Sequence, residues 1–257
     1  MALERLEGVI LKLHALGDTS RIAVLYTRER GIVRTVAKGA RQPRSKFAGS
    51  LAPLHRVSAL LYFKEGRDLQ LLSGLDLIES YASAEDFERL AHAQAAVELV
   101  DRLVWGEEEH AALYDLVTSA LSRIAHAPTD ELASLSVAFQ VQAAGLLGYR
   151  PVLSECAGCG REAGAARQFA ATRGGLLCDR CAAGEAGGLR LSAEGIADLR
   201  RLAGLDWASP ASARSARAGE LLKVMEVYLQ THFQRFSGFR SLELLRAFDF
   251  PGKEPAR

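Results

Sequence analysis

All four cysteines of this 257-residue chain fall within one short segment and follow one regular spacing. Two Cys-x2-Cys pairs are separated by eighteen residues, and the ligands they offer are Cys156, Cys159, Cys178 and Cys181. Two residues between paired cysteines allow a tight turn to aim both sulfurs at one ion. Two such turns can build a tetrahedral cage with Zn–S bonds of about 2.3 Å. We therefore predict one zinc ion bound by these four residues, with a short hairpin or loop between the pairs.

A cage of four thiolates indicates a structural metal rather than a catalytic one. It leaves no open position for a water molecule or a substrate. Four unrelated buried thiols and a redox dithiol are the alternatives, and iron also binds in such cages. The expected effect of the zinc ion is to order residues 152–191, a glycine-containing segment with few apolar residues of its own.

The first 80 residues have the pattern of short β-strands. Apolar runs bounded by glycine and polar clusters predict strands at residues 8–14, 21–26, 32–38, 54–64 and 69–77. In an open sheet, strands this short would leave exposed edges, which closure into a small barrel removes. We predict a five-stranded oligonucleotide-binding barrel (OB-fold), and an SH3-like barrel fits the pattern nearly as well.

Beyond about residue 83 the apolar spacing changes to that of helices. Ser83 to Asp86 resembles a capping box, and Ser192 resembles a second helix cap. Helices are expected at residues 87–104, 108–125, 130–147, 193–203 and 211–236, with a short one near residue 242. The predicted fold class is α+β with several domains: an OB-fold domain (1–80), a helical domain in two parts (81–151 and 192–250), a zinc module between them (152–191), and a disordered tail (251–257).

Positive charge is concentrated in residues 28–46, which contain seven Lys or Arg residues and one acid. Clustered cations neutralise phosphates and release counterions, which is the main source of nucleic-acid affinity. Strand alternation places Arg34 and Lys38 on one side. Exposed bases of single strands can stack on aromatic rings, for which Phe47, Tyr62 and Phe63 are the candidates, although for each ring we favour a place in the hydrophobic core. The predicted nucleic-acid-binding residues are Arg34, Lys38, Arg41, Arg44, Lys46 and Phe47. The alternative is a solvated basic loop without a partner.

Charge also differs between larger segments of the chain. Residues 1–80 contain 13 basic and 8 acidic side chains, a balance of +5, whereas residues 81–150 contain 4 and 11, a balance of −7. Such a difference suggests two units with different partners. For the acidic segment we favour the simpler interpretation of a solvated surface.

Recognisable catalytic patterns are absent from the sequence. There is no phosphate-binding loop, dinucleotide fingerprint, H-E-x-x-H or G-x-S-x-G motif, and the six histidines are scattered without paired spacing. We therefore expect no enzymatic activity. No apolar run reaches the roughly 18 residues that a membrane span needs, and the N-terminus lacks a secretory signal. A cytoplasmic location is expected, where thiols stay reduced and available for metal.

The order of barrel, helices, cysteine module and helices resembles the RecO family of bacterial recombination mediators. The resemblance covers nearly the whole chain. It rests on VAKGAR at 36–41, SKFAG at 45–49, LLGYRP at 146–151, CAGCG at 156–160, and RFS at 235–237 followed by SL at 241–242. It implies an N-terminal OB-fold and a helical domain interrupted by a zinc module. It also implies binding of single- and double-stranded DNA and annealing of complementary strands.

The same resemblance implies protein partners. These are RecR and RecF, the recombinase RecA, and the single-stranded-DNA-binding protein (SSB) that coats DNA gaps. The acidic, Phe-ended tail of SSB is an expected direct contact, although no short motif marks its pocket. The expected location is the cytoplasm, in association with the nucleoid.

Two other classes of function fit the residues. One is an RNA-binding zinc-ribbon protein, which would prefer structured RNA. The other is a scaffold whose basic loop docks an acidic protein and binds no oligonucleotide.

Overall fold

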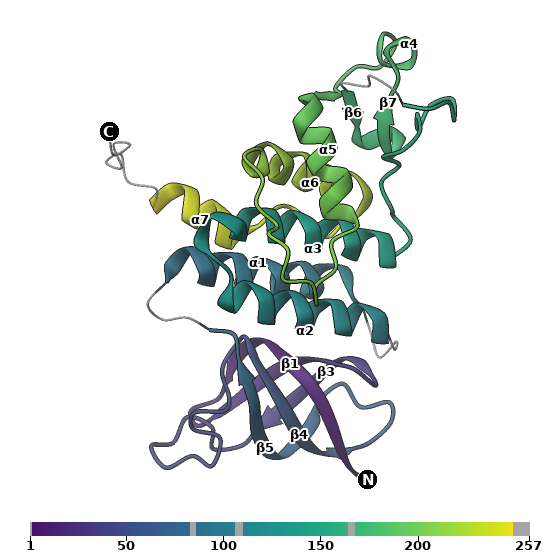
Figure 1. The fold of residues 1–257 in the computed structure, drawn as a ribbon. Helices are drawn as coiled ribbons and strands as arrows, with labels where there is room; N and C mark the ends of the chain where they lie inside the picture. Colours follow the sequence, from purple (N-terminus) through teal and green to yellow (C-terminus); the bar gives the residue numbers. More distant parts are fainter. Residues whose placement is uncertain (1, 83–85, 106–109, 164–167, 249–257) are drawn as a thin grey trace, which may run out of the picture.

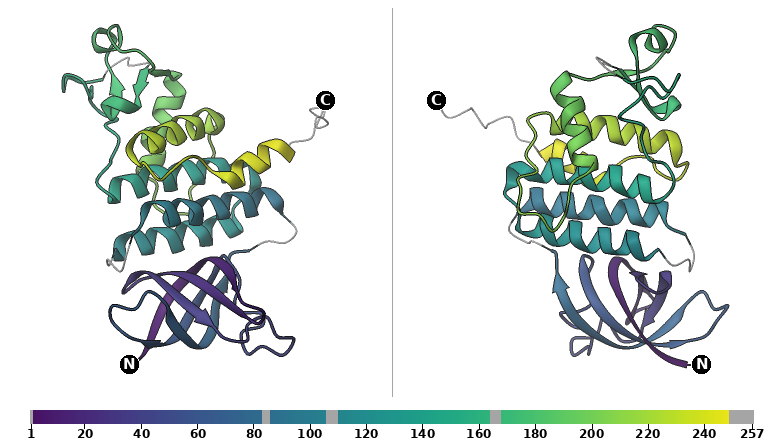
Figure 2. Two further views of the ribbon diagram at one scale, coloured as in Figure 1. Left: turned by 180° about the vertical axis from the view of Figure 1, so that it is seen from behind. Right: turned by 45° about the vertical axis from the view of Figure 1, so that its right-hand side comes forward.

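The computed structural model describes residues 2–82, 86–105, 110–163 and 168–248. A β-barrel forms one end of the molecule, a stack of helices occupies the middle, and a small cysteine-containing module lies at the opposite end (Figure 1). The views in Figure 2 show the same three layers from other sides, with the barrel next to the first helices of the stack.

Five strands form the barrel: β1 (Ala2–Leu16), β2 (Ser20–Thr27), β3 (Gly31–Ala37), β4 (His55–Phe63) and β5 (Gln70–Ser80). They are hydrogen-bonded in the closed order β1-β2-β3-β5-β4, and β4 returns to β1. Every neighbouring pair is antiparallel except β3 and β5. In β3 and β4, buried residues alternate with half-buried or exposed ones, as expected for strands with one face toward the barrel interior.

The N-terminal sheet followed by helices confirms the predicted α+β arrangement at that level. All five predicted strands are present, and β1 is longer than expected because its first residues pair with β4 from Ala2 onward. A register shift between Ile10 and Lys12 marks where β1 bends from one partner strand to the other. The strand count and closed order fit an OB-fold.

The helical stack contains α1 (Phe87–Leu103), α2 (Ala111–His126), α3 (Leu132–Leu146), α5 (Ala193–Ala203), α6 (Ala218–His232) and α7 (Arg240–Phe248). A 3-10 turn, η1 (Thr129–Glu131), precedes α3. Helix α3 is central, since it packs against α1, α2, α5 and α6. Eleven of its 15 residues are buried, which explains why its sequence is apolar on all sides.

Barrel and helices share one hydrophobic core. Val9, Val24 and Tyr26, on the outer face of β1 and β2, belong to the same buried cluster as residues of α1, α2 and α3. Ion pairs border this contact: Lys12 Nζ lies 2.7 Å from Asp101 of α1, and Arg28 pairs with Asp115 of α2. Part of the acidity of residues 81–150 is therefore used within the molecule, against the basic barrel.

Three helix starts can be compared with prediction. Asp86, not Ser83, caps α1 by accepting a hydrogen bond from the Arg89 backbone N–H, and residues 83–85 lie outside the described residues. Ser192 caps α5 as predicted, with its Oγ accepting from the Gly195 N–H. The helix predicted at 211–236 is wrong at both ends, because α6 spans only Ala218–His232.

The segment before α6 is extended because α2 and η1 hold its backbone. The guanidinium of Arg123 donates to three of its carbonyls, those of Asp206, Ser209 and Ala211. Glu131, only 7% exposed, accepts from the Ala213 N–H (3.2 Å) and from the Ser212 hydroxyl. Backbone groups satisfied in this way are not available for helical hydrogen bonds. The predicted tail at 251–257 lies outside the described residues.

Candidate metal centre and nucleic-acid interface

The cysteine module is built on a small antiparallel sheet. Strand β6 (Gln168–Ala170) pairs with β7 (Gly175–Leu177) and with β8 (Leu189–Arg190), and the 3-10 turn η2 (Ala171–Arg173) joins the first two. Cys178 follows β7 directly, and the short helix α4 (Asp179–Ala182) carries Cys181. A hairpin between the two cysteine pairs is therefore present, as predicted.

The two pairs converge on one point in space. The four Sγ atoms all lie within 4.8 Å of one another, and Cys159 Sγ is 3.8 Å from Cys178 Sγ. Sulfurs at the corners of a tetrahedron with bonds of about 2.3 Å are separated by about 3.8 Å. The four residues thus already have the spacing of a thiolate cage, and their donor set fits a metal ion that prefers sulfur.

Local hydrogen bonds favour thiolate at part of this cluster. The Cys178 backbone N–H donates to Cys156 Sγ (3.3 Å), and this contact leads the lowering of the Cys156 pKa to about 6. The Arg161 backbone likewise lowers the pKa of Cys159. The other cysteine sulfurs raise the pKa of Cys181 to about 12. Four neighbouring thiolates repel one another, so full ionisation requires a bound cation.

Two glycines let the chain turn tightly around the sulfurs. A Cβ added at Gly158 would lie 3.2 Å from Cys181 Sγ and 3.3 Å from Cys181 Cβ, so a side chain there would push the two Cys-x2-Cys turns apart. Gly160 has φ +69°, which is accessible to glycine at little cost. Among the described residues, the buried apolar cluster at the cage consists of Cys156 itself with Ala170 and Leu177, which agrees with the expectation of little apolar core.

The seven cations of residues 28–46 do not all face solvent freely. Arg28 pairs with Asp115, and the Arg30 guanidinium lies 3.0 Å from a carboxylate oxygen of Glu4 and over the Phe63 ring. Both side chains therefore stabilise the fold. They were not among the predicted binding residues, and the structure gives a reason to leave them out.

The other five cations are exposed, and none of them forms an ion pair with another described residue. They are Arg34, Lys38, Arg41, Arg44 and Lys46. The loop after β3 is fastened at two points: Arg41 donates to the Gly17 carbonyl (3.0 Å) and Lys46 to the Ser73 carbonyl (2.5 Å). These contacts hold positive charge on a fixed backbone near the β1–β2 turn and the start of β5.

The structure corrects the prediction that Phe47 contacts nucleic acid. Its side chain is 2% exposed and belongs to the buried cluster that fills the barrel. Lys46 Nζ lies 5.2 Å from the centroid of this ring. A ring buried in the barrel core cannot stack on a base, so we remove Phe47 from the candidate set. Phe63 is buried likewise, whereas Tyr62 is 39% exposed.

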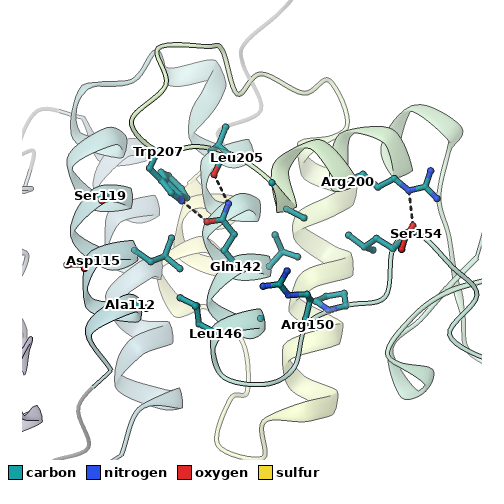
Figure 3. A pocket seen from close by; sticks show the side chains of 17 residues that line it. Ala112, Asp115, Ser119, Gln142, Leu146, Arg150, Ser154, Arg200, Leu205 and Trp207 are labelled. Carbon is teal, nitrogen blue, oxygen red and sulfur yellow. Dashed lines mark hydrogen bonds between the residues drawn. The ribbon is translucent and has the colours of Figure 1, made fainter.

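A pocket of about 820 Å³ opens in the helical stack, and sequence patterns did not reveal it. Figure 3 shows it between α2 and α3 on one side and the end of α5 on the other. Apolar side chains such as Leu116, Val141 and Leu146 line it, and Arg150 and Arg200 lie at one side. Trp207 lines another side of the pocket, and its Nε1–H donates a hydrogen bond to the Gln142 side-chain oxygen (2.8 Å), which holds the indole ring in place.

Comparison with family models covers almost the whole chain. Residues 1–81 match the model described as "Recombination protein O N terminal", and residues 84–243 match "Recombination protein O C terminal". The chain belongs to the recombination protein O family. The boundary between the two matches falls between the barrel and α1, where the fold also changes from strands to helices.

Curated proteins of this family are similar in sequence to this chain over most of their length. A protein named DNA repair protein RecO from Symbiobacterium thermophilum is 38% identical over 207 residues, covering 79% of this chain and 80% of that protein. Proteins of the same name from Thermobifida fusca and Bifidobacterium adolescentis are 32% and 35% identical, each covering 95% of this chain and 99% or 100% of their own. Among the described residues, no helix is both long and apolar enough to cross a bilayer.

Proposed function

We propose that this protein acts in DNA repair as a recombination mediator that binds single- and double-stranded DNA and anneals complementary strands. One observation carries the proposal. The five exposed cations Arg34, Lys38, Arg41, Arg44 and Lys46 lie on one strand and its following loop, without an ion-pair partner among the described residues. Clustered cations that are not paired with carboxylates bind phosphates with little regard to sequence. The names of the family members support the repair context.

Annealing by this surface needs no covalent chemistry. Two strands brought together repel through their phosphates, and a fixed set of cations reduces that repulsion while leaving base edges free to pair. The proposed role is therefore non-enzymatic. The protein would act in the cytoplasm at the nucleoid, and would work with RecR and RecF to load RecA on DNA coated by SSB.

We assign one zinc ion to the four cysteines as a structural element. Four thiolates would enclose the ion, so that it links the Cys156–Cys159 turn to the end of β7. The ion's chemical contribution is this link alone. The Sγ spacing supports a tetrahedral site, and iron is the competing metal.

We propose that the pocket of Figure 3 is the binding site for the SSB tail. A peptide that ends in Phe and is rich in acids needs an apolar cavity for the ring and cations for the carboxylates. Leu116, Val141 and Leu146 supply the first, and Arg150 and Arg200 supply the second. Arg200 Nε donates to the carbonyl of Leu153 (2.8 Å), which also lines the pocket, and this contact holds the Arg200 side chain in place.

Strand annealing tests the proposal directly. Complementary oligonucleotides coated with SSB are mixed with the full chain, and duplex formation is followed by fluorescence quenching. We expect faster annealing than with SSB alone, and loss of most of the acceleration when Arg41, Arg44 and Lys46 are replaced by Ala. An unchanged annealing rate with the native chain would contradict the proposal.

The same material separates the other two classes of function. Tighter binding to structured RNA than to DNA of equal length would favour the RNA-binding alternative. Binding to an acidic protein without binding to any oligonucleotide would favour the scaffold.

A further inference from the structure

A row of apolar side chains crosses the outside of the barrel and belongs to neither hydrophobic core. Cross-strand pairing aligns one residue from each strand: Leu3 of β1 with Tyr62 of β4, Tyr62 with Leu71 of β5, Leu71 with Val36 of β3, and Val36 with Ile22 of β2. Paired residues on neighbouring strands point to the same face. The row is absent from both large buried clusters, the one inside the barrel and the one shared with the helices.

The side chains of this row are more exposed to solvent than is usual for apolar residues. Tyr62 is 39% and Leu3 55% exposed, and Leu71, Val36 and Ile22 are half-buried. On β2 the outward residues closer to the helices, Val24 and Tyr26, are covered by the helical stack. The apolar row lies beyond that cover. Contiguous exposed apolar surface on a folded chain indicates a binding surface.

Cations border the row on the side where β3 ends. Lys38 follows Val36 by two residues and is exposed. On the neighbouring strand, Ser73 follows Leu71 by two residues, and its carbonyl accepts the hydrogen bond from Lys46 (2.5 Å). Because β3 and β5 are parallel, both positive charges lie on the same side of the row.

A second set of cations borders the opposite side. Arg34 precedes Val36 by two residues on the outer face of β3, and Lys64 follows Tyr62 by two residues beyond β4. Since β4 runs antiparallel to β5 and β5 runs parallel to β3, these two residues lie on the same side. Both are exposed, and neither forms an ion pair with another described residue.

We propose that four members of this row, one on each of β4, β5, β3 and β2, form a base-contacting track for single-stranded DNA, distinct from the phosphate-binding loop. They are Tyr62, Leu71, Val36 and Ile22. Unpaired bases would lie on the row, with the Tyr62 ring as the stacking platform, while the flanking cations bind the backbone. A duplex keeps its base faces stacked inside, so the track selects single strands. The proposal rests on the DNA-binding function proposed above, and specifies where the bases go.

The dimensions of the row suit a short stretch of DNA. Four adjacent strands span about 14 Å at about 4.8 Å per gap. This length matches about four nucleotides stacked at about 3.4 Å each. Stacking and apolar contact tolerate any base, since every base has a π face. Cations on both sides favour a phosphate polymer over a second apolar protein surface.

Three variants of the full chain test the track. Tyr62→Ala removes the platform, Tyr62→Phe retains a ring, and Tyr149→Ala removes a Tyr of similar exposure (43%) on the helical stack. Binding is measured by fluorescence anisotropy with an oligo-dT, with the same backbone lacking bases, and with a duplex. Stacking of one base contributes about 1–3 kcal/mol, so Tyr62→Ala should weaken oligo-dT binding about 5- to 150-fold. Tyr62→Phe and Tyr149→Ala should remain within about 2-fold of the native chain.

The base-free backbone decides between the track and simple charge attraction. We expect the native chain to prefer oligo-dT over the base-free backbone, and Tyr62→Ala to lose that preference while its duplex binding stays unchanged. If the native chain binds DNA but does not distinguish the two backbones, or if Tyr62→Ala leaves the preference intact, the track is refuted and the phosphate-binding function stands. If Tyr62→Ala alters self-association and not oligonucleotide affinity, the row is a protein interface and the proposal fails. Absence of any DNA binding would instead refute the underlying function.

Discussion

The salt dependence of DNA binding gives a quantitative test of how many cations contact phosphate. The sequence offers seven cations in residues 28–46, but Arg28 and Arg30 are paired with Asp115 and Glu4. Five therefore remain. For single strands, log Kobs falls with log salt with a slope of about −0.7 per phosphate neutralised, so five contacts predict about −3.5 where seven would predict about −4.9. The affinity should fall about 130-fold from about 50 to about 200 mM salt.

Replacing Arg41, Arg44 and Lys46 together by Ala should reduce the magnitude of the slope by about 2.1. This difference is more informative than either absolute slope, because other cations of the barrel contribute equally to both proteins. The assay is a fluorescence-anisotropy titration of an oligo-dT with the full chain at four or five salt concentrations. Arg44→Ala alone should reduce the magnitude of the slope by about 0.7, and its side chain forms no ion pair with another described residue.

The matched control is the Arg28→Ala and Arg30→Ala double variant. It removes two charges from the same segment, yet it should leave the slope unchanged because neither side chain is free to bind phosphate. A triple variant whose slope equals that of the native chain would refute the reasoning. The reasoning would also be refuted if the double variant reduced the magnitude of the slope by as much per removed charge as the triple variant does. Circular dichroism of each variant ensures that the comparison is between folded proteins.

Three further predictions concern the metal and the core. Cys159→Ser should remove about one equivalent of metal per chain, seen by elemental analysis, and expose the two Cys-x2-Cys turns to limited proteolysis. Phe169 and Leu176 should stay in the main core, so that most helical signal is preserved; retained metal would contradict the site. Burial lowers the pKa of His92 to about 4, whereas the imidazole of the unfolded chain has a pKa of about 6.5. As the pH falls, the unfolded chain therefore binds a proton before the folded one does. The free energy of unfolding should decrease by about 2.5 kcal/mol between neutral pH and about pH 4.5. Urea unfolding at both pH values would measure this loss, and His92→Gln should show a smaller decline; an equal decline would assign it to other groups. Glu131→Ala should cost about 1–3 kcal/mol, since it leaves the buried Ala213 N–H without its acceptor, and a loss below about 0.5 kcal/mol in urea unfolding would contradict that role.

Features encoded by local spacing were predictable from the sequence. The Cys-x2-Cys pairs specify their own turns, and the apolar alternation of β3 and β4 reports which face lines the barrel. The cap at Ser192 depends on one side chain and an N–H three residues later. In each case the determining contacts lie within a few residues, so that no knowledge of the tertiary fold was needed.

Features that depend on distant partners were not predictable. Phe47 lies in a basic, glycine-flanked loop, and only closure of the barrel shows that its ring fills the interior. The residues before α6 read as helix, but Arg123 and Glu131, over 80 positions away from some of their partners, hold them extended. The apolar row through Tyr62 follows from strand register, which single-strand patterns do not fix.

The core shared by barrel and helices makes the first 80 residues a poor candidate for study as an excised piece. Separation from the helices would uncover Val9, Val24 and Tyr26 and leave Lys12 and Arg28 without Asp101 and Asp115. Such a fragment would aggregate through its uncovered apolar face, and the two released cations would strengthen its attraction to any polyanion. Measurements on it would then overstate DNA affinity. In the intact chain these two cations stay paired with α1 and α2, and the charge available to DNA is the native one.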